Sequence, residues 1–229
     1  RGVGGFDLEP AHMTSLLNGL IANGWLQEVD AVITGYIPTL ELADGIARVL
    51  DRLGTEHPEV LYLCDPVIGD DPGGIYVPED VAAAIRDQLV PLADIVTPNR
   101  FELQWLSGVD VSDATSADLA AEAIGADLVA ATSIPAGAGR IANVLSAEDM
   151  AGQAIQLLHR GVPHGTGDLF AALLLGHMLN GMTESEALAR ASAGVEIMVR
   201  ASLGLSEMRM VEELQRAVAA QPTSIEPLG

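Results

Sequence analysis

Residues 163–176, PHGTGDLFAALLLG, place small residues, a hydroxyl and a carboxylate directly before an apolar run. Gly165 and Gly167 let the backbone approach a ligand closely, because they carry no Cβ. The first N–H groups of a following helix have no partners within it and lie at the positive end of its dipole, which favours phosphate. Asp168 would repel a phosphate unless it had another task, such as taking the proton of an attacking hydroxyl. The alternative is that Asp168 only caps the helix and the glycines only form a turn.

Polar residues also follow four short apolar runs that predict buried strands, at residues 31–36, 60–65, 93–97 and 126–132. In an open α/β sheet, ligands bind beyond the carboxyl ends of the strands. We therefore expect these residues to share one site with the glycine-rich turn. They are Gly35 and Tyr36, the segment Asp65 to Asp70, the segment Thr97 to Glu102, and Thr132 with Ser133.

The residue types at these strand ends suit a magnesium-dependent reaction of phosphate. Asp65, Asp70 and Glu102 carry oxygen ligands of the kind that Mg²⁺ prefers, and water would mediate the contacts because Mg²⁺ dehydrates reluctantly. Asn99 and Glu102 are three residues apart, which places them on one face of a helix start. The two hydroxyls after the fourth strand can donate hydrogen bonds to phosphate oxygens. The alternative for Asp65 is that it merely ends a strand before a proline.

Helical spacing of apolar residues predicts the elements that position this chemistry. The predicted helices cover residues 10–21, 39–53, 78–90, 99–106, 113–124, the stretch after Asp168 to about residue 180, 184–201 and 206–220. The less periodic segment 133–164 contains a predicted hairpin around 141–144 and a strand near 154–158, and residues 1–9 are irregular. Strands that alternate with helices and read as continuous apolar runs are typical of a mostly parallel sheet covered on both faces. We expect one α/β domain over residues 1–229.

Composition excludes several classes of function. All eleven basic residues are arginines, so a Walker-type phosphate loop, which needs its lysine, is excluded. The net charge of −21 argues against nucleic acid or an anionic membrane as a partner. ATP would need Mg²⁺ and helix N-termini as compensation. Cys64 is the only cysteine, which favours a packing role in a reducing cytoplasm. We recognise no membrane-spanning stretch and no signal peptide.

Four segments taken together resemble the pyridoxal kinase family of the ribokinase-like superfamily. They are DPVIGD at 65–70, Tyr76-Val77, TPNRFE at 97–102 and GTGD at 165–168, and the resemblance runs from about residue 5 to the C-terminus. GTGD and the Asn-x-x-Glu pattern are shared by the whole superfamily. The segment from Cys64 to Asp70, with its downstream Tyr-Val, is more particular to the vitamin B6 branch, although hydroxymethylpyrimidine kinases share part of it.

The resemblance implies a three-layer αβα fold and ATP- and Mg²⁺-dependent phosphorylation of the 5′-hydroxyl of pyridoxal, and of pyridoxine or pyridoxamine, by a cytoplasmic homodimer. It implies that Asp168 is the general base and that Gly165, Thr166 and Gly167 form the anion hole. Asp65 and Glu102 would organise Mg²⁺ beside Asn99, Asp70 and Tyr76 would lie near the ATP phosphates, Thr97, Thr132 and Ser133 would contact the nucleotide, and Tyr36 would lie near the vitamin ring.

The sequence departs from the family pattern in two places. An N-terminal strand that carries ring contacts is missing, and the segment between Ser133 and Pro163 is short for a lid. Either mobile loops are missing from this sequence or the protein is truncated; we favour the first, since loss of a central strand would expose a sheet edge. A hydroxymethylpyrimidine kinase and a catalytically silent vitamin-binding homologue remain alternatives.

Four further side chains have expected roles outside this chemistry. We expect Trp25 and Trp105 to pack at element ends and His177 to be packed within its helix. Asp71 should be a solvated acid in a flexible loop.

Overall fold

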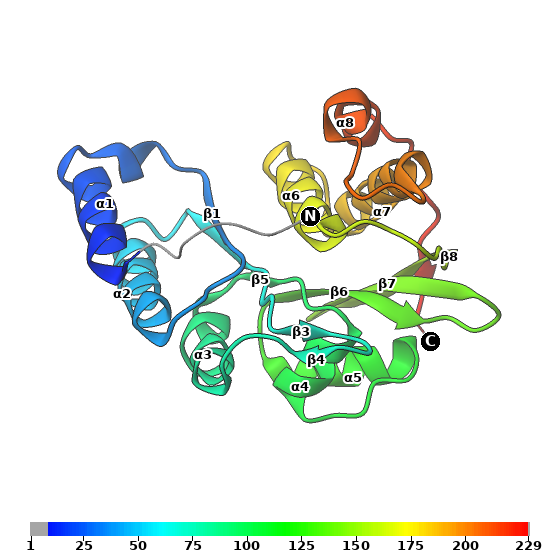
Figure 1. Ribbon diagram of the computed structural model, residues 1–229, viewed down its shortest axis with the longest axis horizontal. Helices are drawn as coiled ribbons and strands as arrows, with labels where there is room; N and C mark the ends of the chain where they lie inside the picture. Colours follow the sequence, from blue (N-terminus) through cyan, green and yellow to red (C-terminus); the bar gives the residue numbers. More distant parts are fainter. Residues whose placement is uncertain (1–8, 229) are drawn as a thin grey trace.

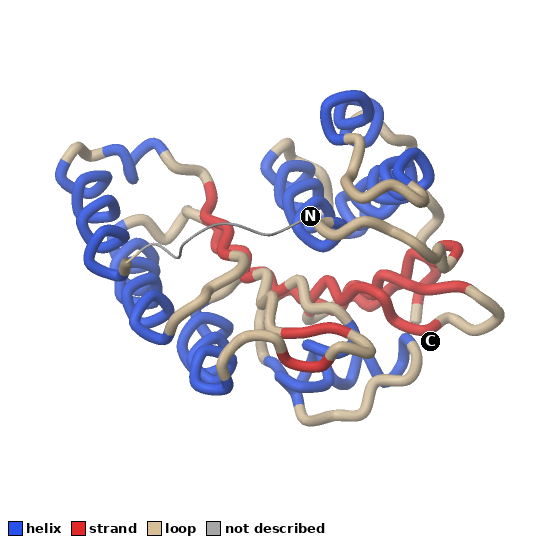
Figure 2. The backbone as a smooth tube through the Cα atoms, in the orientation of Figure 1, coloured by secondary structure: helices blue, strands red, loops and turns tan. Residues whose placement is uncertain are grey.

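The computed structural model describes residues 9–228, so the irregular segment predicted at the N-terminus lies outside the described residues except for Glu9. Its centre is a seven-stranded sheet in the order β1-β2-β5-β6-β7-β8-β9 (Figures 1 and 2). The strands are β1 (Ala31–Thr34), β2 (Leu61–Cys64), β5 (Ile95–Val96), β6 (Leu128–Pro135), β7 (Arg140–Ala147), β8 (Met150–Leu157) and β9 (Glu226–Pro227). A separate small sheet pairs β3 (Gly69–Asp70) with β4 (Gly74–Ile75).

The sheet has a parallel part and an antiparallel part. β1, β2, β5 and β6 pair in parallel, which confirms the α/β architecture and brings their carboxyl ends to one edge. β7 and β8 form the predicted hairpin, and β6 to β9 pair antiparallel. As a result, the end of β6, the start of β7 and the end of β8 meet at the same edge as the carboxyl ends of the parallel strands.

Helices cover both faces of the sheet, as predicted. α6 (Thr166–Leu179), α7 (Glu184–Ser202) and α8 (Met210–Val218) lie together on one side in Figure 1. The other side is packed by α2 (Leu40–Glu56), α3 (Glu79–Ala84), α4 (Arg100–Ser107) and α5 (Ala114–Ile124), with α1 (Pro10–Ala22) packed against α2.

The alternation of side chains along the strands divides the core between the two faces. Leu63 packs with the cluster of α6 and α7, whereas its neighbours Tyr62 and Cys64 pack with the cluster of α2 and α3. Ile95 and Val96 divide in the same way. Burial raises the pKa of the Cys64 thiol to about 12, which fits the packing role expected for this cysteine.

Some predicted helices differ in extent or burial. The helix expected at 78–90 is α-helical only as far as Ala84, continues as a π-helical turn over Ile85–Leu89 and ends in a 3₁₀ turn over Val90–Leu92. Pro91 lies in that last turn, and it cannot donate the backbone hydrogen bond that an α-helix needs. α1 forms as predicted, but none of its residues is buried.

The two tryptophans have different environments. Packing was the wrong expectation for Trp25, which is 59% exposed in the 3₁₀ turn Trp25–Glu28 after α1. Trp105 packs against the core, as expected, and carries the Arg86 guanidinium 5.2 Å from its ring centre. His177 is buried in α6, as predicted.

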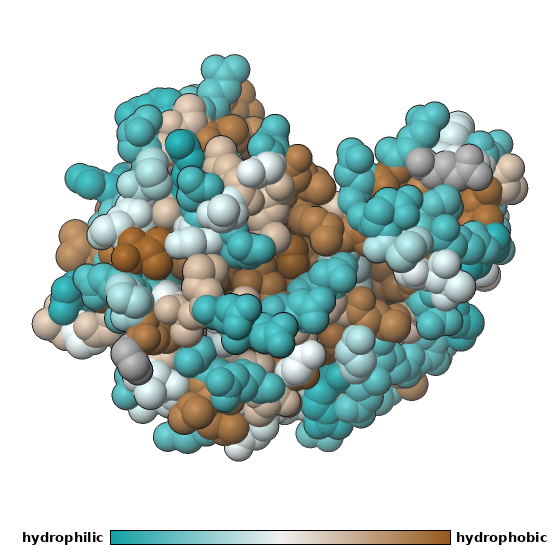
Figure 3. Space-filling model, turned by 180° about the vertical axis from the view of Figure 1, so that it is seen from behind, coloured by the Kyte–Doolittle hydropathy of each residue, from teal (hydrophilic) through white to brown (hydrophobic). Residues whose placement is uncertain are grey.

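β1 stands at one end of the sheet, and no strand among residues 9–228 pairs with its outer edge. Ile33 on this strand is 46% exposed. The surface seen from behind is hollowed between the α1–α2 side and the α6–α8 side, with hydrophobic residues on the walls of the hollow (Figure 3). Within the described residues, no helix is long and apolar enough to cross a bilayer.

Candidate active site

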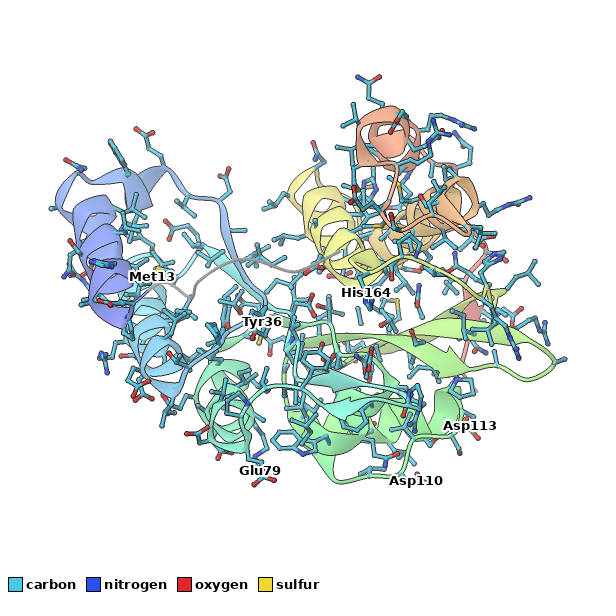
Figure 4. The ribbon with its side chains drawn as sticks, in the orientation of Figure 1. Met13, Tyr36, Glu79, Asp110, Asp113 and His164 are labelled. Atoms are coloured by element: carbon cyan, nitrogen blue, oxygen red, sulfur yellow. The ribbon has the colours of Figure 1, made fainter. Side chains whose placement is uncertain are left out.

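A cavity of about 680 Å³ opens where the strand ends face the N-terminus of α6. It brings together almost all of the residues predicted for the site, namely Asp65, Asp70, Tyr76, Thr97, Asn99, Glu102, Thr132, Ser133, Gly165, Thr166, Gly167 and Asp168. Tyr36 is not among its lining residues and is 58% exposed. Figure 4 shows Tyr36 and His164 at the centre of the molecule, whereas Glu79, Asp110 and Asp113 lie toward its periphery.

α6 begins at Thr166, three residues earlier than expected, so Asp168 lies in the first turn of the helix. The N-cap is Gly165, whose φ of 95° falls in the left-handed region that glycine adopts without strain. Leu169 N donates to the carbonyl of Gly165, which leaves the N–H groups of the first three helical residues without a helical partner. Asp168 is therefore not the capping residue. Its carboxylate lies near the end of β1, because a Cβ on Gly35 would be 4.0 Å from its Oδ1.

Glu102 connects the loop after β2 to the start of α4 through hydrogen bonds. Its side chain is buried, and Oε1 accepts hydrogen bonds from Ile68 N at 2.8 Å and Gly69 N at 3.3 Å. Oε2 accepts from Asn99 N at 2.9 Å, and the Asn99 side chain accepts from Glu102 N, which completes a capping box. Asn99 Nδ2 also donates to the Gly69 carbonyl at 2.8 Å. The Asn-x-x-Glu pattern thus fixes the loop that carries the acids.

Two residues that line the cavity have a backbone conformation that L-residues seldom adopt. Val67 has φ 46° and Ser133 has φ 61°. A β-branched residue in this region is strained, and such strain is found where the surrounding structure imposes it, often at functional sites. Ser133 lies at the point where the register of β6 with β7 shifts, so the bulge there turns this residue toward the cavity.

The cavity is strongly acidic. Asp65 is buried, and burial together with the nearby charges of Glu102 and Asp168 raises its pKa to about 8. Burial also raises the pKa of Glu102, although its backbone hydrogen bonds oppose this effect. Burial and these carboxylates raise the pKa of Tyr76 to about 12. A ligand that binds beside these acidic residues would therefore have to bring positive charge.

Asp71 is exposed, as expected from the sequence, but its carboxylate also forms an ion pair. It binds Arg100, with 2.6 Å between Asp71 Oδ2 and Nε and 2.5 Å to Nη2. Arg100 Nη1 also donates to Gln104 Oε1 and to the carbonyl of Val111. Arg100 thus holds the β3–β4 turn against α4 and the loop before α5. No short sequence motif predicts these contacts.

A second cavity of about 240 Å³ adjoins the first one and shares Thr132, Ser133, Thr166 and Gly167 with it, among others. Its remaining wall combines apolar side chains, among them Phe170 of α6 and Val195 of α7, with the polar side chains of Asn143, Gln156, His159 and Glu196. Two polar contacts lie at the boundary of this second cavity. The buried pair Asn143 Nδ2 and Ser192 Oγ is 2.9 Å apart, and the pair His159 Nε2 and Glu196 Oε1 is 3.0 Å apart. Sequence reasoning missed both pairs, because their members are far apart in the chain and form no motif.

Both the sequence and the fold match known proteins. The sequence model of the family described as phosphomethylpyrimidine kinase matches residues 20–211. The chain is 30% identical to pyridoxal kinase PdxY of Corynebacterium diphtheriae over 94% of this chain and 79% of the relative, and 34% identical to that of Rubrobacter xylanophilus over 93% and 76%. The solved structure of Leishmania donovani pyridoxal kinase in complex with ADP and pyridoxamine matches 99% of this chain and 83% of its own, with a TM-score of 0.89 and 27% identity.

These matches agree with the resemblance carried by the four sequence segments, and they too cover nearly the whole chain. The chain belongs to the pyridoxal kinase family of the ribokinase-like superfamily.

Proposed function

We propose that this kinase transfers the γ-phosphoryl group of ATP to the 5′-hydroxymethyl group of pyridoxal, and of pyridoxine and pyridoxamine. The observation that carries the proposal is that the N-terminus of α6 and the ends of β2, β5 and β6 all open into one cavity. A phosphoryl group in transfer needs positioning and electrostatic stabilisation more than covalent help, and this arrangement can provide both. The related structures with ADP and pyridoxamine or pyridoxine support the choice of substrates.

Asp168 is the general base in this proposal. Its carboxylate is exposed and lies on the cavity wall, within the first turn of α6 and close to the end of β1. A hydroxyl bound there donates its proton to Asp168 as its oxygen attacks the phosphorus atom. Tyr36 lies two residues after the end of β1, and we propose that it borders the vitamin ring.

The anion hole consists of the backbone N–H groups at the start of α6, from Thr166, Gly167 and Asp168, after the left-handed Gly165. These donors are fixed before the reaction begins, and they point toward the cavity at the positive end of the helix dipole. They stabilise the negative charge that the transferring phosphoryl group carries.

Magnesium fits the donor set of the cavity if the nucleotide supplies many of its ligands. Among residues 9–228, no three histidine, cysteine or acidic side chains converge closely enough to hold an ion by themselves. Asp65 is the better anchor, since the oxygens of Glu102 already accept three backbone hydrogen bonds. Asp65, with Glu102 behind it and Asp70 beside it, would hold the ion partly through water. Bound Mg²⁺ neutralises phosphate charge.

The nucleotide extends from the anion hole toward the smaller cavity. We propose that Thr97, Thr132 and Ser133 contact it through their hydroxyls and that Asp70, Tyr76 and Asn99 lie beside the phosphates. The base then occupies the 240 Å³ cavity, which shares Thr132 and Ser133 with the larger one and has apolar side chains such as Phe170 and Val195 in its wall. Stacking and burial of its rings against apolar side chains suit a planar heterocycle.

We propose further that the described chain acts as one kinase domain, because strands from both parts of the sheet and α6 build the same cavity. We also propose a cytoplasmic homodimer. α1 leaves its apolar side chains unburied, with Leu16 at 60% exposure, and such a surface suits a second copy of the chain. Light scattering after gel filtration measures the mass of the assembly.

The function is tested by steady-state phosphorylation of pyridoxal, with ADP release as the readout. Asp168→Asn should lower kcat by about 10²- to 10⁴-fold, the usual contribution of a general base. Binding of ADP should persist, and the control Asp110→Asn, on the periphery, should leave kcat unchanged. Equal turnover by the Asp168→Asn variant would remove this residue from the mechanism.

Hydroxymethylpyrimidine kinase is the second candidate, because the family model that matches carries the name of a pyrimidine kinase. The curated relatives and solved structures favour pyridoxal. Parallel measurement of kcat/KM for pyridoxal and for hydroxymethylpyrimidine separates the two. A higher value for the pyrimidine would overturn the assignment, and no turnover of either would favour a catalytically silent vitamin-binding protein.

A further inference from the structure

The main cavity has more negative than positive side chains to offer a nucleotide. Five carboxylates line it, from Asp65, Asp70, Asp71, Glu102 and Asp168. ATP would bring further negative charge into this acidic surrounding, and Mg²⁺ offsets only part of it. The side chains that could help are the two guanidinium groups on the cavity wall, those of Arg100 and Arg140.

Arg100 is already committed to the fold. Its Nε and Nη2 bind the Asp71 carboxylate, and its Nη1 binds Gln104 and the Val111 carbonyl. Withdrawing it for a ligand would release the β3–β4 turn and leave a partly buried charge without its partner. Arg100 therefore keeps its structural partners when a nucleotide binds.

Arg140 has no such partner. Within residues 9–228, no side chain or backbone group forms a hydrogen bond or ion pair with its guanidinium group, which is exposed on the cavity wall. Its fixed fork of donors matches the oxygens of a phosphate group, and the group stays charged at any physiological pH.

The backbone holds Arg140 at the correct edge of the sheet. It is the first residue of β7, opposite Leu157 of β8, and its N–H and carbonyl close the turn from β6 through Gly137 O and Ala136 N at 2.9 and 3.1 Å. Because β6 and β7 are antiparallel, this position lies beside the end of β6, which carries the Thr132 and Ser133 hydroxyls.

Arg140 lines only the larger cavity and not the 240 Å³ cavity beside it. We propose that Arg140 binds the polyphosphate of the nucleotide, between the base and the anion hole of α6. The inference rests on the proposed function, since it takes the nucleotide to lie across the two cavities. It adds a phosphate-binding residue that no motif in the sequence marks.

The test compares the binding of ADP with that of adenosine, which carries no phosphate group. Titration calorimetry of ADP with the whole chain should give a Kd that Arg140→Ala raises roughly tenfold, about the effect of one charge-assisted hydrogen bond. Arg140→Lys should recover part of that loss. The inhibition constant of adenosine, which has no phosphate, should stay unchanged. The matched control is Arg48→Ala on α2, which removes an exposed arginine that lines neither cavity and should leave the ADP affinity unchanged.

Steady-state kinetics separate this inference from the proposed function. In the active enzyme, Arg140→Ala should raise the KM for ATP and leave the KM for pyridoxal unchanged. An unchanged Kd for ADP, an equal loss for adenosine, or a rise confined to the KM for pyridoxal would each overturn the role of Arg140 while the kinase assignment stands. Should the unaltered protein fail to phosphorylate pyridoxal, the ADP titration still decides the role of Arg140.

Discussion

Replacing Asp65 by asparagine should make the ligand-free protein more stable, and the gain should grow as the pH rises. Burial and the charges of Glu102 and Asp168 raise the pKa of Asp65 from 3.8 to about 8. Between these two values, the unfolded chain has lost the proton that the folded protein keeps. The folded state therefore binds more protons, and its stability falls as the pH rises through this window. Asparagine keeps the shape of the side chain and has no such proton to lose.

The size of the effect follows from the same pKa. One group contributes about 1.4 kcal/mol for each pH unit in this window, so the unaltered protein should lose roughly 4 kcal/mol between pH 5 and pH 8 through Asp65. A change of 1 kcal/mol shifts the Tm of a chain of this size by about 2–4 °C. The Tm advantage of Asp65→Asn should thus grow by roughly 10 °C over this range. Coupling to Glu102 makes the growth gradual, because the two carboxyls titrate together.

The assay is thermal unfolding followed by fluorescence at several pH values from 5 to 9, with EDTA present to keep metal ions away. Asp110→Asn, on the exposed loop before α5, is the matched control, and its Tm difference from the unaltered protein should stay flat. A Tm difference for Asp65→Asn that is constant or shrinks with rising pH would refute the account of the site as a cluster of buried, mutually repelling acids. The same variant should lose most of its kcat/KM for MgATP.

Three further substitutions, one of them with a matched control, test how the site is built. Glu102→Gln should lower the free energy of unfolding in urea by about 2 kcal/mol and raise the KM for MgATP, because an amide cannot accept from all three backbone N–H groups. Gly69→Ala should destabilise the protein by at least about 1 kcal/mol in thermal unfolding, since the new Cβ would lie 2.5 Å from a carbonyl oxygen of β4. Gly54→Ala, within α2 and with open space around it, should instead stabilise slightly. Ser192→Ala should cost about 1–3 kcal/mol in urea unfolding, because it leaves the buried Asn143 amide without its partner.

Much of the fold could be predicted from the sequence because its signals are local. Four apolar runs gave β1, β2, β5 and β6, and the helix expected at 184–201 formed as α7 (Glu184–Ser202), with a Thr183–Glu186 capping box at its start. Boundaries that depend on tertiary packing were less accurate. The strand predicted at 126–132 runs instead over β6 (Leu128–Pro135), because pairing with β7 extends it past the bulge at Ser133. Trp25 was misplaced because a large apolar side chain at a helix end carries no sign of whether anything covers it.

The candidate site was predicted nearly whole for one physical reason: parallel strands deliver their carboxyl ends to one edge, so the residues after each strand converge. That rule says nothing about side chains that arrive from the antiparallel hairpin. Arg140 and His159 were therefore missed, and so was the ion pair of Arg100 with Asp71, whose partners lie 29 residues apart. The left-handed conformation of Val67 was also not predicted, because β-branched residues such as valine rarely adopt it. Roles assigned to individual site residues remain predictions.

The cations on the wall of the main cavity have a chemical consequence for the vitamer itself. Pyridoxal carries an aldehyde and keeps it after phosphorylation, and lysine amines condense with aldehydes to form imines. The guanidinium groups of Arg100 and Arg140 stay protonated and do not react in this way. Since none of the 229 residues is lysine, no lysine side chain of this chain can form an imine with this carbonyl. The reactive product can leave the enzyme as free aldehyde, without first having to be hydrolysed from the protein that made it.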